Sequence, residues 1–252
     1  MSEPDFKLAK APIVEAVLDI DCDMPPMFDL AALEAPARAV FGVQYPKYRA
    51  MFLEQHQIKS MPDEPAKHSA MRAIQALQFL QDDEKQLVQV RAQGFSFNRL
   101  APYSTLDDYL PEIHRVWELF IGVAAPVQIR TIRLRYINRI LLPLTNGSVE
   151  LEDYFKVSPR LPDENKLRFA GFLNQHTAVE VDTGHQVNIV LASQPPENGK
   201  LSVIFDICVA SAHTAEVKNW SWILAEIQSL RGLKNRIFRN TLTETCLNLF
   251  QP

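Results

Sequence analysis

Residues 129–142, with the sequence IRTIRLRYINRILL, constrain the fold more than any other stretch of this chain. In an extended strand, successive side chains point to opposite faces of the sheet, so strict alternation separates two sets. One set is apolar and consists of Ile132, Leu134, Tyr136, Ile140 and Leu142. The other set includes Arg133, Arg135 and Arg139. The pattern therefore predicts a long strand with one core face and one strongly basic face.

The segments that precede this strand alternate between strand and helix patterns. In order, they predict a strand at 12–22, a helix at 29–41, strands at 47–58, 71–80 and 86–97, and a helix at 106–121. The first strand has a part-acidic face with Glu15, Asp19 and Asp21. Residues 60–69 carry two prolines and mixed charges, which predicts a loop. Gly94 indicates a bulge or a close backbone approach within the strand that holds it.

The segments from residue 126 onward repeat this order. They predict a strand at 129–142, a short helix at 149–155, strands at 171–181, 186–191 and 201–210, and a helix at 220–250. Each half therefore reads as strand, helix, three-strand meander and long amphipathic helix.

This order predicts the α+β fold class, with two pseudo-repeated βαβββα-like halves at residues 1–125 and 126–252. The antiparallel sheet, or sheets, would be covered on one face by long helices. We prefer one continuous structural unit, with a curved sheet that crosses both halves. Two independent ferredoxin-like domains are the alternative.

The composition excludes several classes of protein. Apolar residues make up 47% of the chain and charged residues 22%, which is typical of a soluble globular protein with a sizeable core. The net charge of −4 argues against general affinity for nucleic acid, which depends on clustered Lys and Arg. No apolar run approaches the length of a membrane span. Cys22, Cys208 and Cys246 are far apart in the sequence, which favours reduced thiols in a cytoplasmic protein.

Five segments together resemble one known family. They are KAPIVEAVLDI, LVQVRAQGFSFNRLAPYSTLDDY, RTIRLRYINRI, LSVIFDICVA and LKNRIFRNTLTETCLNLF, in that order. The chain is similar over nearly its whole length to a sporadically distributed bacterial family of uncharacterised proteins of about this length. The most specific piece is Leu134-Arg135-Tyr136-Ile137-Asn138, which resembles an LRYIN-like motif of that family. The resemblance implies a bacterial source and one complete unit, and it supplies no catalytic residues.

The charged residues of the predicted sheet are the candidate site. Arg133, Arg135 and Arg139 would lie near the acidic side chains of the first strand, Glu15, Asp19 and Asp21, if the first strands of the two halves pair. One interpretation is a structural ladder of cross-strand ion pairs. The other is a surface on which unpaired Arg side chains bind an anionic ligand or an acidic peptide. Asp206, in an otherwise apolar strand, needs a charged partner, and an Arg of the same face is the candidate.

Sequence motifs offer no chemistry beyond these charges. No pair among the six histidines has metal-ligand spacing, so no metal site is predicted. The chain has no nucleophile elbow, phosphate-binding glycine loop or dinucleotide fingerprint, so no cofactor is predicted. The sequence thus favours a non-enzymatic protein, although catalytic groups assembled from distant positions would leave no motif.

The predicted function is recognition of a peptide or protein partner on an open sheet face. The alternative is an enzyme or small-molecule-binding protein with a charged pocket between the two halves. Nucleic acid and membrane partners are not expected. The C-terminal helix could pack within the chain or against a second copy, so a homodimer is an open alternative.

Overall fold

The chain folds around one large antiparallel sheet. The computed structural model describes residues 8–61, 64–145, 147–163, 166–167 and 169–251. Nine strands form a single sheet in the order β2-β3-β4-β5-β1-β6-β9-β8-β7. Their bounds are β1 Ile13–Asp23, β2 Lys47–Met61, β3 Glu64–Leu80, β4 Gln86–Arg91, β5 Gly94–Leu100, β6 Gln128–Pro143, β7 Leu173–Val179, β8 Gln186–Glu197 and β9 Lys200–Ser211. The helices are α1 Glu34–Phe41, α2 Leu106–Ala124, α3 Trp220–Thr241 and α4 Glu244–Asn248, with a single 3-10 turn, η1, at Leu151–Asp153.

The antiparallel pair β1 and β6 lies at the centre of the sheet and joins the two parts of the chain. Asp19 of β1 lies opposite Arg133 of β6, and Leu18 lies opposite Leu134. β1 also pairs with β5, so the sheet continues without a break across the predicted boundary at residue 126. This pairing excludes two independent domains and agrees with the preferred continuous sheet.

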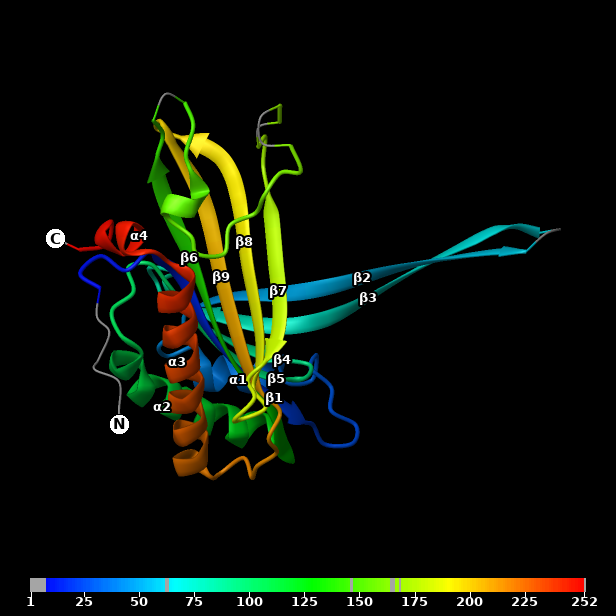
Figure 1. The fold of residues 1–252 in the computed structure, drawn as a ribbon. Coiled ribbons are helices and arrows are strands. Elements are labelled where there is room, and N and C mark those ends of the chain that lie inside the picture. Colours follow the sequence, from blue (N-terminus) through cyan, green and yellow to red (C-terminus); the bar gives the residue numbers. More distant parts are fainter. Residues whose placement is uncertain (1–7, 62–63, 146, 164–165, 168, 252) are drawn as a thin grey trace.

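The apolar face of the sheet packs under the helices (Figure 1). Trp117 of α2 makes an edge-on contact with Phe95 of β5, with ring centroids 5.6 Å apart. Phe238 of α3 stacks on Phe205 of β9 at 5.6 Å. The buried side chains of both parts of the chain form one cluster, so the fold has one core rather than two.

The predicted fold class is wrong. The chain is only 26% helical and is dominated by its nine-stranded sheet, so it is not an α+β fold with long helices. Nor do the two halves share the βαβββα order, because four strands follow α1 whereas three follow η1. The predicted helix at 149–155 shrinks to the turn η1, and the predicted helix at 220–250 is interrupted at Leu242, which has an extended backbone.

Gly94 accounts for one of these differences. The predicted strand at 86–97 is two strands, because the chain turns at Ala92 and Gln93 and returns as β5. Gly94 has a φ of +141°, and a Cβ at this position would lie 2.2 Å from the carbonyl oxygen of Ile20. Only glycine fits this close approach of two backbones.

The β2–β3 hairpin is a further difference from the prediction. Most of the predicted loop at residues 60–69 belongs to these two strands, although residues 62–63 lie outside the described chain. The hairpin extends far beyond the other strands as a two-stranded arm (Figure 1). None of the helices in the described parts of the chain is both long and apolar enough to cross a membrane.

Candidate functional site

The predicted site residues gather on the face of the sheet opposite the helices, where each has a protein partner. Arg133 Nη2 lies 2.7 Å from Asp21 Oδ2. Arg135 Nε lies 3.0 Å from both carboxylate oxygens of Asp206. The pKa of Arg135 is raised, mainly by this hydrogen-bonded carboxylate. Asp206 therefore pairs with an Arg of the same face, Arg135, as predicted.

The remaining predicted residues extend this arrangement across the sheet. Arg139 pairs with Glu197. Glu15 Oε1 accepts a hydrogen bond of 2.7 Å from Asn98. Asn98 in turn accepts one of 2.9 Å from Gln89, which accepts one of 3.0 Å from Gln78. The charged groups of the open face are thus joined to one another rather than left unpaired.

A cavity of about 270 Å³ lies on the helix-covered side, above the central strands. Its walls come from the segment before β1, from β6, and from the helices α2 and α3. Polar side chains on the walls include Tyr103, Tyr136, Asn138, Arg231 and Lys234. The cavity therefore lies between the two halves of the chain, where the alternative function places a pocket. The predicted site residues do not line it, because Glu15, Asp206 and the arginines Arg133, Arg135 and Arg139 belong to the opposite face.

Two tyrosines form the polar floor of this cavity. The hydroxyl oxygens of Tyr103 and Tyr136 lie 2.9 Å apart, within hydrogen-bond distance. Burial raises the pKa of Tyr136 to about 12 and raises that of Tyr103 well above its usual value. Both hydroxyls are therefore protonated at neutral pH and can donate hydrogen bonds.

Lys234 is the unusual charge of the cavity. Its Nζ lies 4.0 Å from the centroid of the Tyr136 ring, in cation–π geometry. Burial strips water from the ammonium group, and the charge of Arg231 adds to this effect, so the pKa of Lys234 falls to about 7. Within the described chain, no carboxylate lies at ion-pair distance from Lys234. Arg231 differs, because its Nη1 lies 2.8 Å from both carboxylate oxygens of Asp107 on α2.

Sequence reasoning missed this cavity for a simple reason. Tyr136 has the parity of a core residue, and Lys234 lies on a helix with a mixed pattern, so neither stands out alone. The Nδ2 of Asn138 donates a hydrogen bond of 2.9 Å to the carbonyl oxygen of Phe205. The one available signal is that a tyrosine and an asparagine, Tyr136 and Asn138, occupy apolar-face positions of the central strand.

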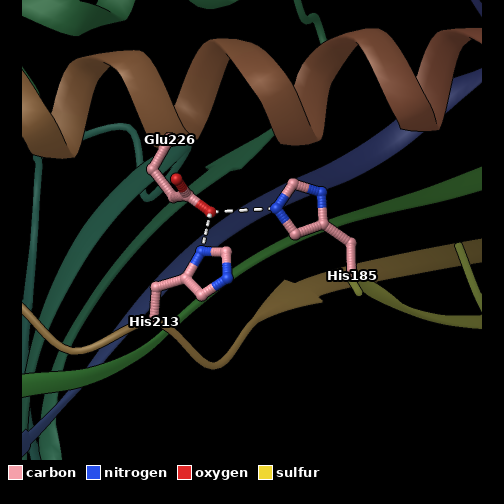
Figure 2. Close-up of side chains that lie close together, drawn as sticks. All are labelled: His185, His213 and Glu226. Carbon is pink, nitrogen blue, oxygen red and sulfur yellow. Dashed lines mark hydrogen bonds and ion pairs between the residues drawn. The ribbon is translucent and has the colours of Figure 1, made fainter. Parts of the chain in front are cut away.

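A second group of polar side chains lies near the end of the sheet that carries the β7–β8 turn (Figure 2). His185 comes directly before β8, His213 follows β9, and Glu226 points from α3 toward both imidazoles. Glu226 Oε1 lies 2.9 Å from His185 Nε2 and 3.3 Å from His213 Nδ1. Burial raises the pKa of the Glu226 carboxyl, but hydrogen bonds from Ser211 and His185 outweigh it and hold the pKa below its usual value. Spacing along the chain gives no sign of this group, because its members are 28 and 13 residues apart (213 − 185 and 226 − 213).

In comparisons with known proteins, no family model, curated protein or solved structure matches this chain significantly. The resemblance drawn from the LRYIN-like segment therefore stays a prediction.

Proposed function

We propose that the protein binds a small anionic molecule in the cavity between α2 and α3. The observation that carries this proposal is Lys234, an ammonium group on the cavity wall with no carboxylate partner in the described chain. An unpaired charge away from water is costly, and an anionic ligand would supply the missing partner. The open-face arginines Arg133, Arg135 and Arg139 are less suited to bind an anion, because each already forms an ion pair with a carboxylate.

Apart from the carboxylate of Asp108, the other groups on the walls suit the same class of ligand. One of the Tyr103 and Tyr136 hydroxyls donates to the other, and the remaining O–H can donate a hydrogen bond to a carboxylate or phosphate oxygen. Leu106 and Phe238 supply apolar walls, so a compound with one anionic group and a short apolar body fits best. The volume of about 270 Å³ admits only a small compound.

Binding should be linked to a proton. At about pH 8, a lysine with a pKa of about 7 is roughly nine-tenths neutral. An anion beside the amine favours its charged form, so the complex should take up a proton as it forms. Proton uptake distinguishes binding at Lys234 from binding at a fully charged surface lysine.

Calorimetry with inorganic phosphate, citrate and benzoate as probes tests the proposal. Titrations at about pH 8 in two buffers of different ionisation enthalpy should show uptake of up to about one proton for a probe that binds. Lys234→Met should abolish binding, and Lys218→Met, at an exposed position before α3, should leave it unchanged. Absence of binding by all three probes, or equal binding by the Lys234→Met variant, would refute the proposal.

Recognition of a peptide or protein by the sheet remains a second candidate. The β2–β3 arm favours it, because Met51, Phe52 and Leu53 near its base are 40–44% exposed. Strands β2 and β7 are the edges of the sheet, and an edge strand offers unpaired backbone groups to a partner strand. In either case we propose a non-enzymatic protein of the cytoplasm, which the three free thiols support.

A further inference from the structure

The group formed by His185, His213 and Glu226 brings together three side chains that can each offer one ligand atom to a metal ion. The side chain of His185 is 3% exposed and that of Glu226 is 13% exposed, whereas that of His213 is 58% exposed. Two imidazoles and one carboxylate therefore converge at a point that is closed on one side and open to solvent on the other. Their ligand atoms all lie within 4.8 Å of one another.

We propose that His185, His213 and Glu226 form a binding site for a divalent transition-metal ion, with zinc as the best match. Imidazole nitrogens with a carboxylate oxygen suit zinc and its neighbours, whereas calcium and magnesium prefer oxygen ligands. Three protein ligands would leave a fourth position for water, on the side where His213 is exposed.

Two of the three spacings between ligand atoms are close to those of tetrahedral zinc, and all three ligand atoms lie within 4.8 Å of one another. With metal–ligand distances of about 2.0–2.1 Å, two ligand atoms of a tetrahedral site lie about 3.3 Å apart. The distances from Glu226 Oε1 to His185 Nε2 and to His213 Nδ1 are 2.9 Å and 3.3 Å. Side-chain rotations would have to lengthen the first of these distances and bring the two imidazole nitrogens to about the same spacing.

The second ring nitrogen of His185 supplies an independent argument. His185 Nδ1 is buried and has no hydrogen-bond partner. The nearest carboxylate oxygen is Glu180 Oε2, at 3.8 Å. If Nε2 carries the proton and donates it to Glu226, the bare Nδ1 lone pair faces a carboxylate, which is unfavourable. If Nε2 instead binds a metal, the proton lies on Nδ1 and points toward Glu180.

Glu180 is itself held in place. Its carboxylate pairs with Arg236 of α3 and accepts a hydrogen bond of 2.5 Å from Thr183. A carboxylate behind a metal-binding histidine fixes the ring orientation and increases the basicity of the ligand nitrogen. Glu180 Oε2 lies 3.8 Å from His185 Nδ1, so it would have to come closer on metal binding to support the ring through a hydrogen bond.

Metal titration of the chelator-treated full chain tests the proposal. Zn²⁺ should bind at one equivalent per chain, and Co²⁺ should give the visible absorption of a tetrahedral complex, whereas Mg²⁺ and Ca²⁺ should not compete. His213→Ala and Glu226→Gln should each weaken Zn²⁺ binding by more than about tenfold. Glu180→Gln should weaken it by about tenfold, because the support behind His185 is lost.

Two controls keep the test decisive. His176→Ala removes an exposed histidine of β7 outside the group and should leave the affinity unchanged. His213 is mostly exposed, so its replacement should leave metal-free unfolding unchanged and a loss of binding cannot be attributed to misfolding. Equal Zn²⁺ affinity in the parent and the His213→Ala variant, or no saturation at one equivalent, would overturn the proposal and leave a histidine–carboxylate hydrogen-bond cluster.

Discussion

Replacement of Lys234 by methionine should stabilise the protein at neutral pH and remove part of its pH dependence. Methionine keeps the unbranched shape of the lysine stem and fills irregular space without a charge. The parent protein holds a lysine whose pKa is about 7 in the folded state against 10.5 in the unfolded chain. The unfolded state therefore binds more protons between these two values, and stability rises with pH over that window.

The magnitude follows from the two pKa values. At about 1.4 kcal/mol per pKa unit, the partly buried position of Lys234 lowers the stability by up to about 5 kcal/mol at about pH 6.5. At about pH 9 the same position costs about 2 kcal/mol, because the unfolded lysine has begun to lose its own proton. The stability difference between the variant and the parent should therefore shrink by about 2–3 kcal/mol from the lower pH to the higher.

Urea unfolding of both proteins at the two pH values measures this change. Lys218→Met, at an exposed position, should show a difference from the parent that does not vary with pH. Other groups titrate equally in all three proteins, so only the pH dependence of the difference is diagnostic. A Lys234→Met difference that stays constant within about 0.5 kcal/mol would refute the argument from burial.

Two further predictions concern the open face and the β4–β5 turn. Arg135→Ala should lower the free energy of unfolding by about 1–2 kcal/mol, because the Asp206 side chain, which is 12% exposed, loses its hydrogen-bond donors. Arg133→Ala should lower it by less than about 1 kcal/mol, because Arg91 still lies 2.7 Å from Asp21. Equal losses of stability in urea unfolding would contradict the pairing. A variant that keeps its stability but no longer binds a peptide or protein partner would favour recognition on this face. Gly94→Ala should lower the free energy of unfolding by about 2–4 kcal/mol, because the added Cβ would meet the Ile20 carbonyl oxygen. Gly122→Ala in α2 should raise it by about 0.5–1 kcal/mol, since nothing lies within 4 Å of the added Cβ. Similar unfolding free energies for the two glycine variants would contradict this reasoning.

The central strands could be predicted because their patterns are local. Strict alternation in β6 predicted both its extent and its two faces, and the apolar parity of β1 did the same. The close backbone approach offered as one interpretation of Gly94 is confirmed, but its partner, the backbone of β1, lies far away in the sequence, and the turn at Ala92 and Gln93 was not predicted. The 3-10 turn at Leu151–Asp153 shows a similar limit, since one helical turn is too short for periodicity to decide.

The candidate sites likewise include features that local sequence patterns predict and features that they do not. The partner of Asp206 could be predicted, because an isolated carboxylate in an apolar strand requires a cation on its own face. The cavity and the histidine group could not, because each combines residues from segments that only tertiary structure brings together. Lys234 in particular has an ordinary helical sequence context, and its pKa is set by burial that no local pattern reports.

The register of β6 links the two faces of the molecule. A slip by one residue would exchange the faces of every side chain in the strand. Arg133 and Arg135 would then point into the core, and Tyr136 would leave the cavity where it contacts Lys234 and Tyr103. The ion pairs with Asp21 and Asp206 oppose such a slip from one side, and the buried Tyr136 opposes it from the other. The paired charges of the open face thus help to hold the cavity residues in place, even though no charged group of that face lines the cavity.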